Sequence, residues 1–151
     1  VLKSIDDFGR FAGREKEAAA KRAQIEKEYA ALTQDVQKGR GPKVLIIFGS
    51  PDSFNMSTKK SFGGDLAERL GAVNIADKAE NVKDSSYIPL SMEFVAKLRA
   101  NMRDNAIWHD VNAVKNNRVY QLPPSLFTVN PGTHTIDAMK IMKEYIYGEV
   151  K

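Results

Sequence analysis

The sequence contains no cysteine, which excludes structural disulfides and thiolate metal sites within its 151 residues. It also lacks any apolar run near the ~18 residues that a membrane-spanning helix needs, and it shows no secretory signal. The excess of positive charge is small, a net +4 from 23 Lys and Arg against 19 Asp and Glu. A solvated surface accounts for such an excess better than a nucleic-acid partner does. Because the sequence begins at Val1 rather than methionine, we expect that an upstream segment has been removed.

The familiar catalytic patterns are missing as well. No Ser-His-Asp or Cys-His order and no pair of carboxylates in one loop is present. What is present is ordinary globular composition, 42% hydrophobic and 28% charged, in a chain long enough for one domain with its own core. The sequence therefore offers no set of residues that suggests catalysis.

The first third of the chain has the pattern of a single long helix. Ser4 is a candidate cap answered by Asp7, and "GRGP" at residues 39–42 ends the pattern. Apolar residues recur at helical spacing along one narrow stripe, at Phe8, Phe11, Ala18, Ile25, Tyr29, Leu32 and Val36. The opposite face is charged, so the helix is expected to lie on another element. A coiled-coil dimer is the alternative that this pattern leaves open.

The remainder alternates strand and helix patterns. The apolar run Val44–Phe48 predicts a strand buried on both faces, central in a parallel sheet, and "SPDSFNMSTKKS" follows it as a polar loop. "GDLAERLGA" predicts a helix with Leu66 and Leu70 inward, and "VNIAD" a short strand. These patterns indicate an α/β fold with a mainly parallel sheet flanked by helices.

The second half continues the same alternation. A helix is expected at residues 91–101, capped by Ser91, and the strand "RVYQL" at 118–122 after an Asn-Asn turn. "PPSLFTVNPGTHT" is then expected to be a long loop at a strand end. An amphipathic helix closes the chain, with inward side chains at Ile136, Met139, Ile141, Met142 and Ile146.

The glycines in "SFGGDLAERLGAVNIAD", residues 61–77, have two possible explanations. Phosphate binding would need G-x-G-x-x-G or a G-x-x-x-x-G-K-[ST] loop directly after a strand, and neither is present. Packing fits better, because Gly63 and Gly64 would permit a tight turn and Gly71 would take the left-handed position after the helix.

Three segments carry a family resemblance: "GDLAERLGAVNIAD", "LSMEFVAKL" and "AIWHDVNAVKNNRVY". In this order they resemble the C-terminal lobe of the helical-backbone substrate-binding proteins, which serve ABC importers of ferric siderophores, haem and vitamin B12. The resemblance implies a long backbone helix at residues 1–40, joining two lobes, and one Rossmann-like C-terminal lobe at 41–151. It also implies that the ligand lies in a cleft between two lobes, of which this chain supplies one.

The chain departs from the family pattern after Asn101, where "MRDNAIW" follows at once. The family has a further strand, loop and helix at this place, so a missing segment is implied at Asn101–Met102. In haem-binding members that segment can hold an iron-ligating histidine. His109, beside Trp108, is better explained as a structural or surface residue.

The loops after the predicted strands supply the candidate ligand contacts. Parallel strands deliver their following loops to the same edge of a sheet, so Phe54, Met56 and Phe127 are expected to form one exposed apolar wall. Met56 could act as a thioether iron ligand, although an apolar contact explains it better. His134 borders the expected cleft. The full set of predicted ligand-binding residues is Ser53, Phe54, Asn55, Met56, Phe127 and His134.

Glu93 has a separate expected role. It lies two residues after Ser91, where the helix dipole alone could explain it. In the resembled family a glutamate in this Ser-x-Glu position docks on arginines of the membrane permease. The resemblance thus implies a receptor for an iron chelate, with no intrinsic cofactor and no catalytic or resident metal site. It implies a monomer that works with an ABC permease. The receptor is expected outside the cytoplasm, either periplasmic or anchored by a lipid. A flavodoxin-like α/β enzyme or cofactor-binding domain remains the alternative.

Overall fold

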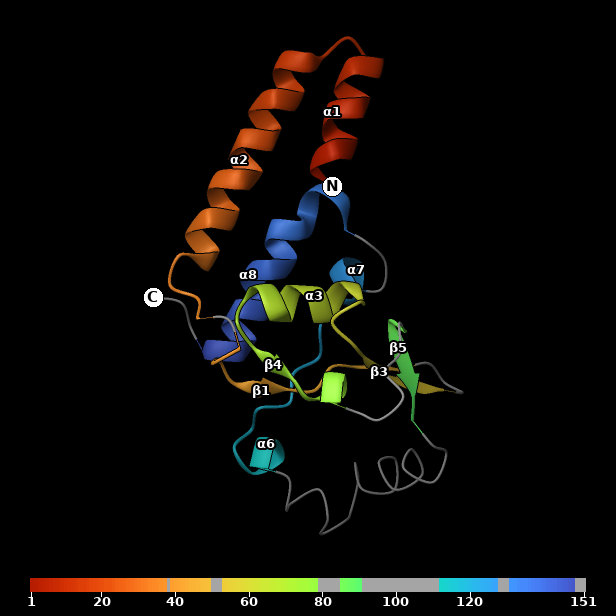
Figure 1. The fold of residues 1–151 in the computed structure, drawn as a ribbon, viewed down its shortest axis with the longest axis vertical. Helices are drawn as coiled ribbons and strands as arrows, with labels where there is room; N and C mark the ends of the chain where they lie inside the picture. The colour runs from red at the N-terminus through yellow and green to blue at the C-terminus, as the bar shows by residue number, and fades with distance from the viewer. Residues whose placement is uncertain (38, 50–52, 79–84, 91–111, 128–130, 149–151) are drawn as a thin grey trace.

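The computed structural model describes residues 1–37, 39–49, 53–78, 85–90, 112–127 and 131–148. Two antiparallel helices, α1 (Leu2–Phe11) and α2 (Glu15–Thr33), form a hairpin that stands off an α/β lobe (Figure 1). The turn of this hairpin is the end farthest from the lobe. The described elements of the lobe are β1 (Lys43–Val44), β2 (Ile47–Gly49), β3 (Phe54–Ser57), α3 (Phe62–Arg69), β4 (Val73–Asn74), η1 (Ile75–Lys78), β5 (Tyr87–Pro89), α6 (Asn112–Lys115), α7 (Pro124–Phe127), η2 (Gly132–His134) and α8 (Thr135–Tyr147).

The prediction of one helix through residues 4–36 is wrong, because the chain reverses between Phe11 and Glu15. Gly13 takes a left-handed backbone conformation there (φ +65°), which glycine adopts without steric cost. Ser4 lies inside α1, whose N-cap is Val1, so Ser4 is no cap. A Cβ atom on Gly9 would lie 2.4 Å from the Cβ of Ala18. The two helices therefore approach closely because position 9 has no side chain.

The apolar stripe of the hairpin is used only in part. Ile25, Tyr29 and Leu32 of α2 pack on the core of the lobe, as the spacing predicted. Phe8 and Phe11 do not follow the stripe, since they are 72% and 90% exposed near the hairpin turn. The partner of α2 is α1 of the same chain, joined to it by an ion pair between Arg22 and Asp6.

The central strand predicted at Val44–Phe48 is divided into two short strands. β1 pairs in parallel with β4, while β2 pairs antiparallel with β3, and β3 antiparallel with β5. Phe48 is 40% exposed, so the run is not buried on both faces. The α/β class and a parallel strand pair are confirmed, but the described lobe also contains an antiparallel sheet. That sheet includes residues 54–57, which were expected to be a loop.

The packing explanation of the glycine pair is confirmed. Ser61 caps α3, accepting a hydrogen bond from the Gly64 N–H at 3.0 Å. A Cβ atom on Gly64 would lie 1.9 Å from the Thr58 carbonyl oxygen, so close packing of the Thr58 backbone requires glycine at this position. Gly71 follows α3 at φ +81°, in the left-handed conformation expected there.

The core lies between α3, α8 and the C-terminal half of α2. Its buried hydrophobic residues are Ile25, Leu66, Ala67, Leu70, Ala72, Ile136, Ala138, Met139 and Met142. α8 also caps its two neighbours: Lys143 Nζ donates to the Leu32 carbonyl at 2.8 Å, and Tyr147 Oη donates to the Leu70 carbonyl at 2.6 Å. Burial raises the pKa of Tyr147. α8 thus fixes the ends of α2 and α3.

The C-terminal third agrees with the sequence in its closing helix and in the Asn-Asn turn, where Asn117 has φ +51°. α8 is present as expected, with Ile136, Met139 and Met142 buried and Ile141 and Ile146 partly buried. The strand predicted at 118–122 is wrong, because this segment pairs with no strand of the described sheets. The expected loop after it contains the short helices α7 and η2.

Some predictions concern other parts of the chain. The predicted helix at 91–101, the residues Glu93 and His109, and the break at Asn101–Met102 lie outside the described residues. Among the helices that the structure describes, none is long and apolar enough to cross a membrane.

Candidate functional site

The first group of predicted ligand residues lies on β3. Phe54 and Met56 are two positions apart and therefore share one face of the antiparallel sheet. Met56 is paired across the sheet with Ile47 and Ile88, so this face is apolar. Both side chains are partly exposed.

The other two predicted residues of this group are placed differently. Asn55 points to the opposite face of the sheet from Phe54, since its register partners are Phe48 and Pro89. Ser53 is exposed just before β3. Side chains alternate between the two faces of the sheet along β3. Phe54 and Met56 therefore lie on one face, Asn55 lies on the other, and Ser53 precedes the strand.

Phe127 lies at the end of α7 and belongs to an aromatic pair. Its ring centroid is 6.1 Å from that of Phe62, the first residue of α3, in a tilted arrangement. Both rings are partly buried and pack on the core. Phe62 was missed by the sequence analysis, which considered only the glycines of this segment. The structure brings Phe127 to Phe62; that Phe127 forms one wall with Phe54 and Met56 stays a prediction.

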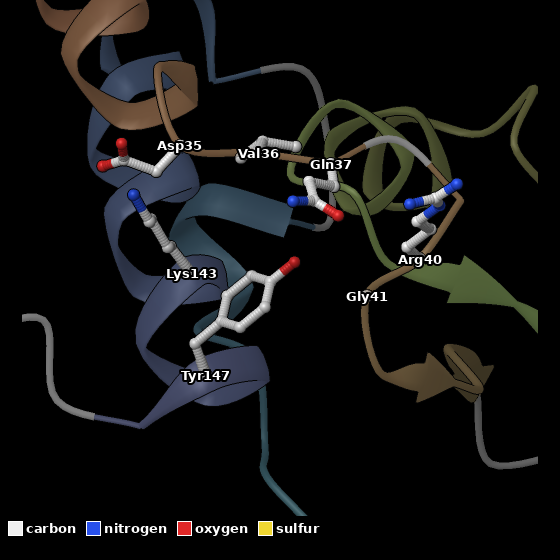
Figure 2. A pocket seen from close by; sticks show the side chains of 7 residues that line it. All are labelled: Asp35, Val36, Gln37, Arg40, Gly41, Lys143 and Tyr147. Atoms are coloured by element: carbon white, nitrogen blue, oxygen red, sulfur yellow. The ribbon is translucent and has the colours of Figure 1, made fainter.

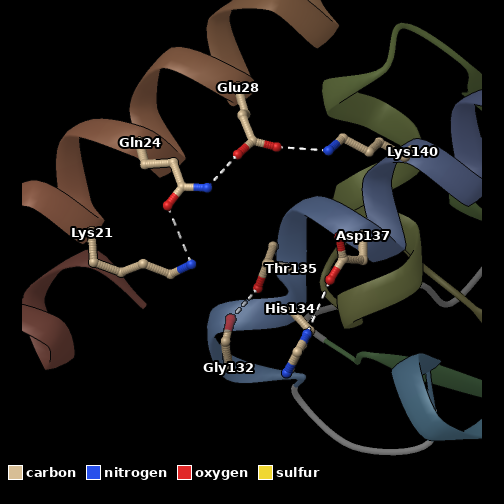
Figure 3. A network of polar contacts seen from close by, with 8 residues as sticks. All are labelled: Lys21, Gln24, Glu28, Gly132, His134, Thr135, Asp137 and Lys140. Atoms are coloured by element: carbon tan, nitrogen blue, oxygen red, sulfur yellow. Dashed lines mark hydrogen bonds and ion pairs between the residues drawn. The ribbon is translucent and has the colours of Figure 1, made fainter.

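His134 lies in the turn before α8, on the surface. Its Nδ1 is 3.0 Å from a carboxylate oxygen of Asp137, one turn into the helix (Figure 3). The turn is held by the Thr135 hydroxyl, which donates to the Gly132 carbonyl at 2.7 Å. The other ring nitrogen, Nε2, has no partner within the described part of the chain. This histidine is therefore oriented and still accessible to a ligand.

A polar network connects α2 to α8 beside this turn. Lys140 Nζ lies 2.6 Å from one carboxylate oxygen of Glu28, and the Gln24 amide donates to the other at 2.9 Å (Figure 3). The hydrogen bond from Lys140 lowers the pKa of Glu28, and the same bond raises the pKa of Lys140. All three side chains are on the surface, so the network orients α2 on the lobe rather than adding much stability.

Two surface pockets lie elsewhere. One, of about 420 Å³, opens between the segment after α2 and the end of α8 (Figure 2). Lys143 and Tyr147 point into it, and both are already bonded to helix-terminal carbonyls. The second, of about 570 Å³, is lined mainly by α3, β4 and η1. Neither contains a predicted ligand residue, and in the described ranges no cluster of three His, Cys, Asp or Glu side chains could hold a metal ion.

The structure thus combines an α/β lobe, an attached helical hairpin and a partly exposed pair of aromatic rings. The chain matches the model of the periplasmic binding protein family over residues 1–126 and belongs to that family. This agrees with the resemblance inferred from the sequence.

Among its relatives is the high-affinity heme uptake system protein IsdE of Staphylococcus aureus. The chain is 29% identical to the protein of strain bovine RF122 / ET3-1 over 136 residues, covering 77% of the chain and 45% of the relative. It is 30% identical to the protein of strain MRSA252 over 130 residues, covering 73% and 43%. The chain thus spans less than half the length of these curated relatives.

Solved structures show the same fold. S. aureus IsdE complexed with heme superimposes with a TM-score of 0.73 at 28% identity, covering 97% of this chain and 63% of that one. An ABC transporter substrate-binding protein from Listeria monocytogenes EGD-e superimposes with a TM-score of 0.74 at 24% identity, covering 98% and 64%. The second match, at this identity, supports the fold alone.

Proposed function

We propose that this chain is the C-terminal lobe, with its backbone helix, of a substrate-binding protein that delivers an iron chelate, haem or a ferric siderophore, to an ABC importer. The observation that carries the proposal is the partly exposed aromatic pair Phe62–Phe127, on a lobe whose relative is named for haem uptake. Aromatic rings with a few polar groups are typical of small-molecule sites.

The hairpin supports a two-lobe arrangement with residues 1–40 as the connector. The C-terminal half of α2 is anchored to the lobe through Ile25 and through the Glu28–Lys140 pair. Toward the hairpin turn, Phe8 and Phe11 leave large apolar side chains in solvent, which a second lobe packed there would cover. In this arrangement α2 bridges the two halves of a ligand cleft.

The remaining roles follow from the family resemblance. Glu93 is the proposed docking residue toward a membrane permease. The receptor is proposed to act as a monomer outside the cytoplasm, periplasmic or lipid-anchored, and to have no catalytic activity. The flavodoxin-like alternative would need a phosphate-binding loop after Gly49, and within that segment residues 54–57 form strand β3, paired with β2.

Titrating haem and several ferric siderophores tests the proposal. We expect the complete receptor to bind one of them tightly, and this chain alone to bind the same chelate far more weakly, since one wall of a cleft leaves the ligand largely solvated. Submicromolar affinity of the isolated chain would contradict the two-lobe account. No binding by the complete receptor would contradict the iron-chelate function.

A further inference from the structure

α2 is attached to the lobe by two lysines of α8. Lys140 Nζ lies 2.6 Å from the carboxylate of Glu28 (Figure 3). Lys143 Nζ donates to the Leu32 carbonyl at 2.8 Å, one turn farther along α2. We propose that these two lysines clamp α2 at a fixed angle on the lobe and that this angle sets the width of the ligand cleft. The effect on the cleft rests on the proposed function, whereas the clamp itself does not.

The two halves of α2 have different partners. Arg22, nearer the hairpin turn, forms an ion pair with Asp6 of α1. Farther along the helix, Ile25 lies in the core of the lobe and Glu28 pairs with α8. α2 is therefore held to the hairpin at one end and to the lobe at the other, and the clamp lies at the end held to the lobe.

The described part of the segment that follows α2 is packed tightly on the lobe as well. The Gly41 N–H donates to the Gly71 carbonyl at 3.0 Å, and a Cβ atom on Gly71 would lie 2.7 Å from Val36 Cγ1. A Cβ atom on Gly41 would lie 2.6 Å from the hydroxyl oxygen of Tyr147, at the end of α8. Lys143 and Tyr147 point into the pocket between α8 and this segment (Figure 2). The end of α2 thus moves with the lobe as one body.

The length of α2 makes its angle important for the cleft. From Glu28 back to Glu15, at the hairpin turn, the helix extends for about 20 Å, so a tilt of roughly 10° at the clamp moves its far end by roughly 3 Å. A gap of about 1 Å already removes a large part of a dispersion contact. A second lobe carried by the hairpin would therefore lose contact with a ligand that this lobe still holds.

A simpler explanation is that Lys140 and Glu28 make an ordinary surface contact. Their side chains are 53% and 31% exposed, and an exposed ion pair contributes little to the free energy of unfolding. Stability therefore does not separate the two explanations. They differ in the angle of α2 on the lobe, which changes on breaking the pair only if the pair is part of a clamp.

The distance between two spin labels reports this angle. The sequence contains no cysteine, so cysteines introduced at Ala19 of α2 and Glu68 of α3, both exposed, carry the only labels. Double electron–electron resonance on the labelled chain should show one narrow distance distribution. Lys140→Glu places two carboxylates together, and Lys143→Met removes the hydrogen bond to Leu32. Each should shift or broaden the distribution while the circular dichroism of the chain stays unchanged.

A charge exchange provides the rescue. Glu28→Lys combined with Lys140→Glu rebuilds the pair in the opposite sense and should restore the narrow distribution, which a general loosening of the fold would not do. Asp7→Asn is the matched control, because Asp7 pairs with Arg10 within α1, and this change should leave the distribution unaltered. An unaltered distribution in either Lys140→Glu or Lys143→Met would overturn the clamp, and so would failure of the charge exchange to restore it.

The effect on the cleft is tested in the complete receptor, titrated with haem and with ferric siderophores. For the chelate that the wild type binds, Lys140→Glu should weaken the affinity and speed dissociation, and the charge exchange with Glu28 should restore both. An altered distance with unchanged affinity would overturn the link between the clamp and the cleft. Binding of no chelate by the wild type would overturn the proposed function and that link together, while the distance measurement would still decide the clamp.

Discussion

Gly64 permits a stringent test of how α3 is packed. In Gly64→Ala the new Cβ would lie 1.9 Å from the Thr58 oxygen and 2.5 Å from the Thr58 carbonyl carbon. Both are backbone atoms, so neither can move aside as a flexible side chain would. Overpacking of this kind costs roughly 1–3 kcal/mol, and a backbone clash places the expected loss near the upper end, about 3 kcal/mol.

Gly63→Ala is the matched control within the same helical turn. A Cβ there would lie 3.7 Å from Ile46 Cγ2, an ordinary contact, and alanine in a helix is favoured over glycine by roughly 0.5–1 kcal/mol. Urea unfolding of the chain, followed by circular dichroism, should therefore show opposite shifts for the two variants. For a chain of this length the loss in Gly64→Ala corresponds to a fall in Tm of roughly 6–12 °C. Equal stability of the two variants would refute the packing of α3 on Thr58.

Three further changes have defined outcomes. Gly9→Ala should loosen the hairpin, because its Cβ would lie 2.4 Å from that of Ala18, and hydrogen exchange in α1 should rise while exchange in α8 stays constant; equal exchange in α1 would contradict the close helix approach. Tyr147→Phe should cost about 1 kcal/mol through the lost hydrogen bond to Leu70. Burial raises the pKa of Tyr147 in the folded state. The contribution of this tyrosine to stability is therefore complete below the unfolded pKa of about 10 and is lost as pH rises from there through the folded pKa. The wild type should lose more stability than Tyr147→Phe above pH ~10, and parallel pH profiles would contradict this. Glu93→Arg in the complete receptor should impair chelate uptake by cells without changing the affinity of the purified receptor; normal uptake would end the docking proposal.

The helices of the lobe could be predicted from the sequence because their signals are local. α3 has Ser61 as a capping residue and Gly71 in the left-handed position after it, and α8 has a clear apolar period through Ile136, Met139 and Met142. The reversal at Gly13 was missed because the charged, alanine-rich sequence on either side has strong helix propensity, and the decisive contact is the tertiary approach of Gly9 to Ala18.

The sheet could be predicted only in part. β3 was taken for a loop because polar residues surround it, although Phe54 and Met56 alternate with Asn55 and Ser57 as a strand requires. The run from Val44 to Phe48 is divided into two strands because β1 and β2 pair with different strands. Pairing between distant segments leaves no pattern in the local sequence. The aromatic pair of Phe62 and Phe127 joins residues far apart in the chain, so sequence spacing gave no sign of it.

A crystal structure of the complete receptor with its bound iron chelate would measure the central claim directly. The account predicts a chelate held between two lobes, with Phe127 of the aromatic pair in van der Waals contact with it. A chelate bound away from the end of the lobe that carries α7 and the start of α8 would contradict the account.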